Sequence, residues 1–126
     1  MRVLLDTQVL VRAYIADAPL SRKVYALLSS PETSPLLSAV SIIEIAMKHD
    51  AGKLKMGTNE MRQAVRDLGL QVIPFGPEHA LRLYDLPRHH RDPFDRMLIA
   101  TALTEGIPLI GSDRQFKKYK GLKVIW

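Results

Sequence analysis

The stretch RDPFDRMLIATALTEGIPLIGSD, residues 91–113, carries the pattern that decides the fold. Asp92 followed by Pro93 is a typical helix start, because aspartate accepts amide hydrogen bonds and proline suits the first helical position. Residues 92–106 have apolar side chains at helical spacing, and residues 107–112 form a short apolar run that predicts a buried strand. A helix that leads directly into a buried strand is typical of parallel α/β sheets.

The same alternation runs through the rest of the chain. The sequence predicts strands at 2–5, 35–38, 70–75 and 122–126, helices at 7–17, 21–30, 41–54, 58–69 and 76–87, and a helical turn at 113–119. This order favours an α/β fold: a three-layer α/β/α sandwich with a mainly parallel, Rossmann-like sheet of about five strands. The 126 residues contain no repeats or linkers, and we expect one domain over 1–126.

Composition excludes several classes of protein. The chain is 47% hydrophobic and 25% charged, as ordinary soluble proteins are, and its apolar runs are far shorter than the roughly 20 residues of a membrane span. The first apolar run meets a charge at Asp6, so no export signal is expected and the cytoplasm is the expected location. The absence of cysteine excludes thiolate metal sites and a cysteine nucleophile.

Four acidic residues stand where a parallel sheet places functional groups. Ligands of such sheets bind at the carboxyl ends of strands, near the point where the strand order reverses. Asp6 directly follows the first predicted strand, and Asp113 follows the strand at 107–112. Glu44 and Asp95 lie on helices that begin beside strand ends. We therefore expect these four carboxylates to lie near one another.

Several of these acids also have a purely structural interpretation. Asp6 and Asp92 suit the cap of the helix that follows each, and Asp95 in a first turn is stabilised by the helix dipole. Either Ser112 or Asp113 suits the cap of the turn at 113–119. Capping and metal binding are compatible, so both interpretations of these residues stay open.

Glu44 has its own structural alternative. Ser41 and Glu44 have the spacing of a capping box, in which the glutamate side chain returns to the backbone of the cap. If the helix begins earlier, with Ser38 as its cap, Glu44 lies about two turns in and cannot close the box. A glutamate among isoleucines is then part-buried, and a buried carboxylate needs a partner charge or a metal.

The joint pattern of acids favours a bound cation. Two charges about 5 Å apart repel by about 3 kcal/mol at an effective dielectric of about 20, so four converging carboxylates require a countercharge. Oxygen ligands suit Mg²⁺ or Mn²⁺, which polarises a phosphoryl group and activates a bound water. Setting these four aside leaves nine of the 13 acidic residues against 18 basic ones, and an acidic centre in basic surroundings fits cleavage of a nucleic-acid backbone.

Other chemistries have weaker support. The sequence has no glycine-rich phosphate loop and no G-x-S-x-G motif. His89 and His90 are adjacent and would point apart, so a shared ion is not expected. The apolar surroundings of four aromatic residues predict positions in the core; these residues are Tyr14, Tyr25, Tyr84 and Phe94.

Together these residues resemble the PIN-domain family, especially the VapC-type toxins of type II toxin–antitoxin pairs. The resemblance rests on the segments LLDTQVLV (4–11), SAVSIIEIAMKHDAGKL (38–54), HHRDPFDRMLIATA (89–102) and IPLIGSDRQFKKYKGLKVIW (107–126). It implies an acidic cluster that binds Mg²⁺ or Mn²⁺ and hydrolyses RNA, leaving 5′-phosphate and 3′-hydroxyl ends. It also implies a homodimer and a small VapB-like antitoxin that occupies the groove of the site.

The resemblance also assigns the metal site. Asp6, Glu44, Asp95 and Asp113 match the family's acidic positions, and Asp92 matches a subfamily acid that would contact the ion only through water. The chain departs from the family at three positions, where members often have histidine, an aromatic residue and threonine; here these are Gln8, Ile43 and Gly111. Ser112 either replaces the threonine hydroxyl or caps the following turn.

The sequence thus predicts a Mg²⁺- or Mn²⁺-dependent endoribonuclease that acts as the toxin of a toxin–antitoxin pair. Asp6, Glu44 and Asp95 would hold the ion, and Asp113 would complete the site or hold a second ion. Four nearby residues are predicted to bind the RNA substrate: Arg91, Arg96, Arg114 and Ser112. Two alternatives remain: a DNA or flap-type nuclease with the same centre, and an inactive nucleic-acid-binding module whose acids are structural.

Overall fold

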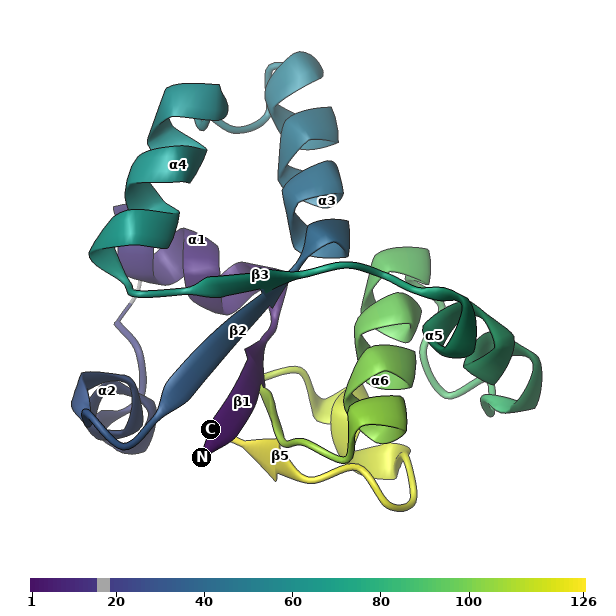
Figure 1. Cartoon of the computed structure of the whole chain (residues 1–126). Coiled ribbons are helices and arrows are strands. Elements are labelled where there is room, and N and C mark those ends of the chain that lie inside the picture. The colour runs from purple at the N-terminus through teal and green to yellow at the C-terminus, as the bar shows by residue number, and fades with distance from the viewer. Residues whose placement is uncertain (16–18) are drawn as a thin grey trace.

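A computed structural model describes residues 1–15 and 19–126, and its core is a sheet of five parallel strands (Figure 1). The strands are β1 (Arg2–Leu5), β2 (Ser34–Ser38), β3 (Gln71–Ile73), β4 (Leu109–Ile110) and β5 (Val124–Ile125). They lie in the order β3-β2-β1-β4-β5, and each neighbouring pair is parallel. The strand order therefore reverses at β1, because the chain moves outward to β3 and then returns to place β4 on the other side.

Six α-helices and two 3₁₀ turns surround the sheet within the described residues. They are α1 (Thr7–Ile15), α2 (Arg22–Ser29), α3 (Ala39–Asp50), α4 (Thr58–Asp67), α5 (Pro77–Arg82), η1 (Leu83–Asp85), α6 (Pro93–Glu105) and η2 (Arg114–Lys118). The last two residues of the helix predicted over 7–17 lie outside the described residues. None of the described helices is long and apolar enough to cross a membrane.

Alternation along the central strands builds a core on each face of the sheet. Val3 and Leu5 of β1 pack into one buried cluster and Leu4 packs into the other, because successive strand side chains point to opposite faces. Leu37 and Leu36 of β2 divide in the same way, and so do the two residues of β4. Both faces are therefore covered, and the predicted three-layer α/β/α sandwich is confirmed.

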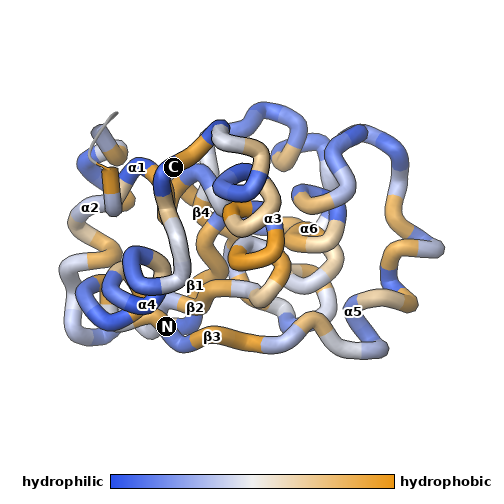
Figure 2. The backbone as a smooth tube through the Cα atoms, turned by 90° about the horizontal axis from the view of Figure 1, so that it is seen from above, coloured by the Kyte–Doolittle hydropathy of each residue, from blue (hydrophilic) through white to orange (hydrophobic). Residues whose placement is uncertain are grey.

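The two helical layers differ in the elements that form them. On one face α1, α2 and α4 contribute Leu10, Val24 and Met61 to the buried cluster. On the other face α6 and η2 contribute Leu98 and Phe116. Figure 2 shows hydrophobic residues along the strands and the inner parts of α3 and α6, and hydrophilic residues in many of the outer turns.

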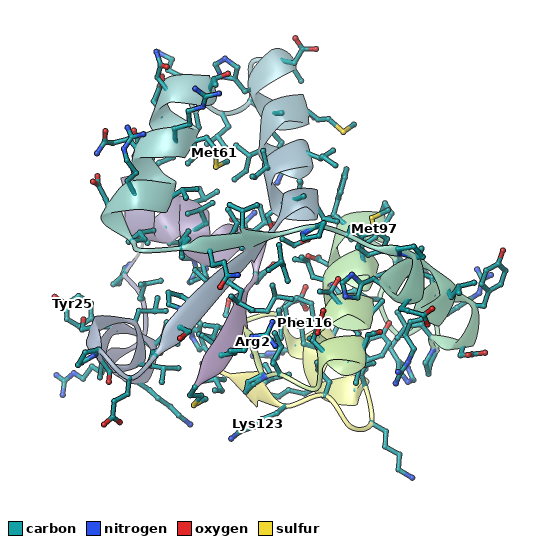
Figure 3. The ribbon with its side chains drawn as sticks, viewed as in Figure 1. Arg2, Tyr25, Met61, Met97, Phe116 and Lys123 are labelled. Carbon is teal, nitrogen blue, oxygen red and sulfur yellow. The ribbon has the colours of Figure 1, made fainter. Side chains whose placement is uncertain are left out.

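Two of the four aromatic residues predicted in the core lie at the surface instead. Tyr25 is 68% exposed on the outer side of α2 (Figure 3), because Val24 is the residue of that turn that faces the sheet. Tyr84 is 88% exposed in η1, where Leu83 and Leu86 take the inward positions. The predictions for these two tyrosines were wrong, since an apolar neighbourhood in sequence does not fix which side of a short helix is buried.

Tyr14 and Phe94 agree better with the prediction. Both are partly buried and pack against the two core clusters, Tyr14 on the side of α1 and Phe94 on the side of α6.

Candidate metal centre

Asp6 lies at the carboxyl end of β1, the strand at which the sheet order reverses. It is 4% exposed, and its Oδ1 receives no hydrogen bond from the residues that the structure describes. Burial raises the pKa of Asp6 to about 7, and the negative charge of Asp95 adds to the rise. The Thr7 amide lowers the pKa, while the charges of Glu44 and Asp113 raise it further.

Glu44 projects from the second turn of α3. Ser38 caps this helix by accepting a hydrogen bond from the Val40 amide at 3.1 Å, so the capping box of Ser41 and Glu44 is not formed and the alternative with Ser38 is confirmed. One carboxylate oxygen, Oε2, lies 3.1 Å from Nζ of Lys48, one turn further along the helix. The other, Oε1, is buried and receives no hydrogen bond within the described part of the chain.

Asp92 caps α6, as the sequence predicted. Its Oδ1 accepts hydrogen bonds from the amides of Phe94 at 2.9 Å and Asp95 at 3.1 Å. Asp95 is thereby fixed in the first turn, at the edge of the site. Burial raises the pKa of Asp95 to about 6, the charge of Asp92 adds to the rise, and His90 opposes it.

Asp113 follows β4 and caps η2, because its Oδ1 accepts a hydrogen bond from the Gln115 amide at 2.9 Å. Ser112 is exposed and does not cap the turn, which decides between the two alternatives. Burial raises the pKa of Asp113, but the hydrogen bonds from Gln115 and His90 outweigh it, so the pKa lies below its usual value.

His90 occupies the centre between two of these acids, a position that the sequence reasoning did not predict. Its Nε2 lies 2.8 Å from Oδ2 of Asp113 and 3.1 Å from Oδ2 of Asp95. Its Nδ1 accepts a hydrogen bond from the Asp92 amide at 3.1 Å, so in a neutral ring Nε2 carries the proton and donates it to the carboxylates. His89 points elsewhere and packs edge-on against Tyr119, with ring centroids 5.0 Å apart.

The backbone around His90 explains its position. The His90 amide donates a hydrogen bond to the Tyr119 hydroxyl at 2.8 Å, and the ring packs on Phe116 with centroids 5.7 Å apart. Arg96 donates hydrogen bonds to the carbonyls of Pro87 at 2.9 Å and Leu86 at 3.3 Å. The segment before α6 is thus held from both sides, and the only signal for His90 in the sequence is its place two residues before the helix cap.

Two buried hydroxyls hold α1 against α3 behind the acids. Thr7 Oγ1 and Ser41 Oγ share a hydrogen bond at 2.8 Å, and both residues are buried. Thr7 directly follows Asp6, and Ser41 lies three residues before Glu44. The pair therefore fixes the relative positions of the two most buried carboxylates.

Of the three departures from the family pattern, one is explained by close packing and two lie at the surface. Gly111 is buried, and a Cβ atom there would lie 2.8 Å from the Phe116 ring and 3.1 Å from Cβ of Asp6, so no threonine fits. Gln8 and Ile43 are both exposed, on the outer sides of α1 and α3.

The predicted basic residues divide into two groups. Arg91 and Arg114 are exposed near the acidic centre. The guanidinium of Arg96 is part-buried and its donors are directed at backbone carbonyls, which gives it a structural task in holding the segment before α6.

The donors of this centre suit a hard divalent cation. One carboxylate oxygen each of Asp95 and Asp113 and a ring nitrogen of His90 lie within 4.8 Å of one another, and His90, whose Nε2 carries a proton, orients the two carboxylates. Asp6 and Glu44 are outside that tight group, yet Asp95, Glu44 and Asp113 each raise the pKa of Asp6, and Glu44 and Asp113 raise that of Asp95, so the four acids share one electrostatic environment. Two buried carboxylate oxygens, on Asp6 and Glu44, receive no hydrogen bond from residues 1–15 and 19–126, and a cation would satisfy them.

Fold and site together describe an α/β/α protein whose acids gather at the reversal point of a parallel sheet. Residues 3–122 match the model of the PIN domain family. The chain therefore belongs to the PIN domain family, a nuclease family whose members generally use divalent metals. Among curated protein sequences, none matches this chain significantly.

Solved structures share the fold over almost the whole chain. A chain of VapBC2 from Rickettsia felis, bound to a DNA fragment from the promoter, aligns with a TM-score of 0.74 and 18% identity, covering 99% of this chain and 98% of that one. DNA-bound VapBC from Salmonella typhimurium gives a TM-score of 0.72 and 15% identity over 99% and 97%. A toxin–antitoxin complex from Klebsiella pneumoniae gives 0.66 and 19% over 98% and 96%.

Proposed function

We propose that this protein is a Mg²⁺- or Mn²⁺-dependent endoribonuclease that acts as the VapC-type toxin of a toxin–antitoxin pair. The observation that carries the proposal is a pair of buried carboxylate oxygens near Asp95, Asp6 Oδ1 and Glu44 Oε1, which receive no hydrogen bond from the part of the chain that the structure describes. Burying carboxylate oxygens without hydrogen-bond donors is costly, and a bound cation would offset that cost beyond what Lys48 supplies to the other oxygen of Glu44. Membership of the PIN family supports the same activity.

The five acids of the site would have three different tasks. Asp6, Glu44 and Asp95 would hold the ion, which when bound would polarise the scissile phosphate and lower the pKa of a water. Asp113 would complete the site, and Asp92 would contribute by fixing Asp95 at the helix start. Thr7 and Ser41 would keep Asp6 and Glu44 in fixed relative positions. Their hydrogen bond joins α1, which begins directly after Asp6, to α3, which carries Glu44.

The basic surroundings support a polyanionic substrate. The net charge is +5, and the exposed Arg91 and Arg114 lie on segments that also carry site acids. These residues, with Ser112 at the rim, would bind the RNA backbone, whereas Arg96 would contribute its charge from a fixed position. Cleavage would leave 5′-phosphate and 3′-hydroxyl ends.

The similar solved complexes support the partner proposal. Several contain VapBC proteins or are described as toxin–antitoxin complexes, so we propose a VapB-like antitoxin as partner and a homodimer as the assembly. An enzyme of this kind acts on RNA in the cytoplasm, which is the proposed location.

Parallel cleavage assays test the activity. Matched single-stranded RNA and DNA oligonucleotides would be incubated with the protein and Mg²⁺ or Mn²⁺, with a chelator control, and the product ends mapped. The proposal expects metal-dependent cleavage of the RNA. Preferential cleavage of the DNA would favour the DNA or flap-type nuclease. No cleavage of either substrate with any divalent ion would favour an inactive nucleic-acid-binding module.

A further inference from the structure

We propose that a cavity beside the acidic centre binds one nucleotide unit of the RNA strand, next to the scissile phosphate. The cavity has a volume of about 610 Å³, and we call it the arginine cavity. Its lining includes Leu83, Arg88, Arg91, Pro93, Arg96 and Met97. The identity of the ligand rests on the proposed function, whereas the existence of an anion-binding cavity does not.

His90 is a wall shared by the arginine cavity and the acidic centre. It lines the cavity, and its Nε2 lies 2.8 Å from Asp113 and 3.1 Å from Asp95. The two sites therefore meet at this residue. A strand whose phosphate lies at the carboxylates would place its neighbouring nucleotide at the arginine cavity.

The charges of the cavity suit a phosphate. Arg88 and Arg91 are exposed, and neither forms an ion pair with any residue that the structure describes. Arg96 adds a third positive charge and is held in place by its hydrogen bonds to Leu86 and Pro87. No carboxylate is among the described residues that line the cavity. Two free guanidinium groups can bind phosphate oxygens with paired hydrogen bonds.

The remaining walls suit a sugar or base. Leu83, Pro93 and Met97 give the cavity apolar sides, and arginine planes also stack on bases. Sites for single-stranded nucleic acid combine positive charge for the backbone with flat or apolar surfaces for bases. The cavity therefore fits a nucleotide better than a bare anion, which would use only the arginines.

The positions of the methionines provide an internal control. Met97 on α6 lines the arginine cavity, whereas Met47, Met56 and Met61 line a separate cavity of about 710 Å³ between α3 and α4. Figure 3 shows Met97 and Met61 on different sides of the molecule. Methyl groups of the two cavities can therefore be observed separately in one labelled protein.

The first experiment is a titration of methyl-labelled methionine protein with UMP, AMP or inorganic phosphate, followed by NMR in the presence of EDTA. We expect UMP or AMP to change the chemical shift of the Met97 methyl group until the site is saturated. The methyl signals of Met47, Met56 and Met61 should stay unchanged. Two results would overturn the proposal: no shift of the Met97 methyl signal with UMP or AMP, or equal affinity for inorganic phosphate. Because metal and cleavage are absent, the result stands even if the proposed ribonuclease activity fails.

Matched double variants provide the second test. Arg88→Gln/Arg91→Gln should weaken the Met97 titration at least tenfold. The same variant should raise the KM for RNA with little change in kcat, and lower the salt dependence of RNA binding by roughly 0.7 per lost phosphate contact in a log–log plot. The control is Arg22→Gln/Lys23→Gln on α2, which removes the same charge from exposed positions. If both double variants weaken binding equally, the loss of net charge explains the effect. The cavity proposal would then fail, while the proposed ribonuclease activity would be unaffected.

Discussion

The imidazole of His90 donates a hydrogen bond to Asp113, with Nε2 and Oδ2 2.8 Å apart. The bond joins the segment before α6 to the residue that caps η2 after β4, and further contacts of His90 with Phe116 and Tyr119 hold the same two segments together. Because Asp113 is half-buried and otherwise held only through the Gln115 amide, His90 fixes where its second carboxylate oxygen lies. His90 is therefore a positioning residue for the proposed metal centre.

Removal of His90 should weaken metal binding. Residues that orient metal ligands typically contribute 10- to 100-fold in affinity or activity. We expect His90→Ala to lower the affinity for Mn²⁺, measured by calorimetry, by about tenfold. His89→Ala serves as the control, because His89 packs on Tyr119 outside the acidic group. Unchanged Mn²⁺ affinity of His90→Ala would contradict the positioning role. A higher affinity would mean that the imidazole competes with the ion.

The metal-free protein should lose stability as the pH rises from about 4 to about 7. Burial raises the pKa of Asp6 to about 7 and that of Asp95 to about 6, whereas an unfolded aspartate titrates near 3.9. Between these values the folded state binds more protons than the unfolded state, so the free energy of unfolding falls with pH and levels off above pH 7. One pKa unit corresponds to about 1.4 kcal/mol, so the total loss is a few kcal/mol.

Thermal melting in EDTA across this pH range measures the effect. Asp6→Asn should flatten the profile, because it removes the group with the larger shift, and Mn²⁺ should raise the Tm most at pH 8, where both acids are charged. A Tm in EDTA that rises from pH 4 to pH 7 would contradict the burial of these carboxyls.

The cap and the charge of Asp92 can be separated by substitution. Asp92→Ala removes the acceptor for the Phe94 and Asp95 amides and should lower the free energy of unfolding by about 1 kcal/mol. Asp92→Ser keeps an acceptor without the charge, so it should retain most of the stability and of the RNA cleavage. Urea unfolding and single-turnover cleavage check both variants. If Asp92→Ser is as stable as wild type but inactive, Asp92 also acts on the ion.

The contact between Gly111 and Phe116 leaves no room for a side chain. Gly111→Ala would place Cβ 2.8 Å from the Phe116 ring, and overpacking of this kind typically costs about 1–3 kcal/mol. We expect lower stability and, because the added Cβ would also lie 3.1 Å from Cβ of Asp6, weaker Mn²⁺ binding. Phe116→Leu should partly relieve the clash, so the double variant should be more stable than the sum of the single effects predicts. Strict additivity would show that the ring is not the obstacle.

The fold and the acidic cluster could largely be predicted from the sequence, because both follow from local rules. Alternating residues such as Leu4 and Leu5 specify a strand buried on both faces, and the end of a strand fixes where Asp6 must lie. The start of α3 was less certain, since both Ser38 and Ser41 are suitable caps. The Ser38 hydroxyl accepts the hydrogen bond of the Val40 amide, so α3 begins at Ala39 and Glu44 lies in the second turn.

The positions of the His90 and Arg96 side chains could not be predicted from local sequence rules. Their positions depend on the path of residues 86–92, which have no regular structure and are held by contacts from Tyr119 and α6. Arg96 resembled a substrate-binding residue because of its charge beside the acids. Its donors are directed at backbone carbonyls of the same segment, a pairing between elements that no spacing pattern encodes, and the prediction that Arg96 binds substrate stays a prediction.

The most direct test of the central claim compares wild type with Asp95→Asn in the cleavage of single-stranded RNA with Mn²⁺. Asparagine keeps the size of the side chain, and the backbone amide of residue 95 can still donate its hydrogen bond to Oδ1 of Asp92. The substitution removes only the charge that would bind the ion. We expect normal folding by circular dichroism and a loss of at least 100-fold in the single-turnover cleavage rate. Cleavage by Asp95→Asn at the wild-type rate would contradict the assignment of the acidic cluster as the catalytic metal centre.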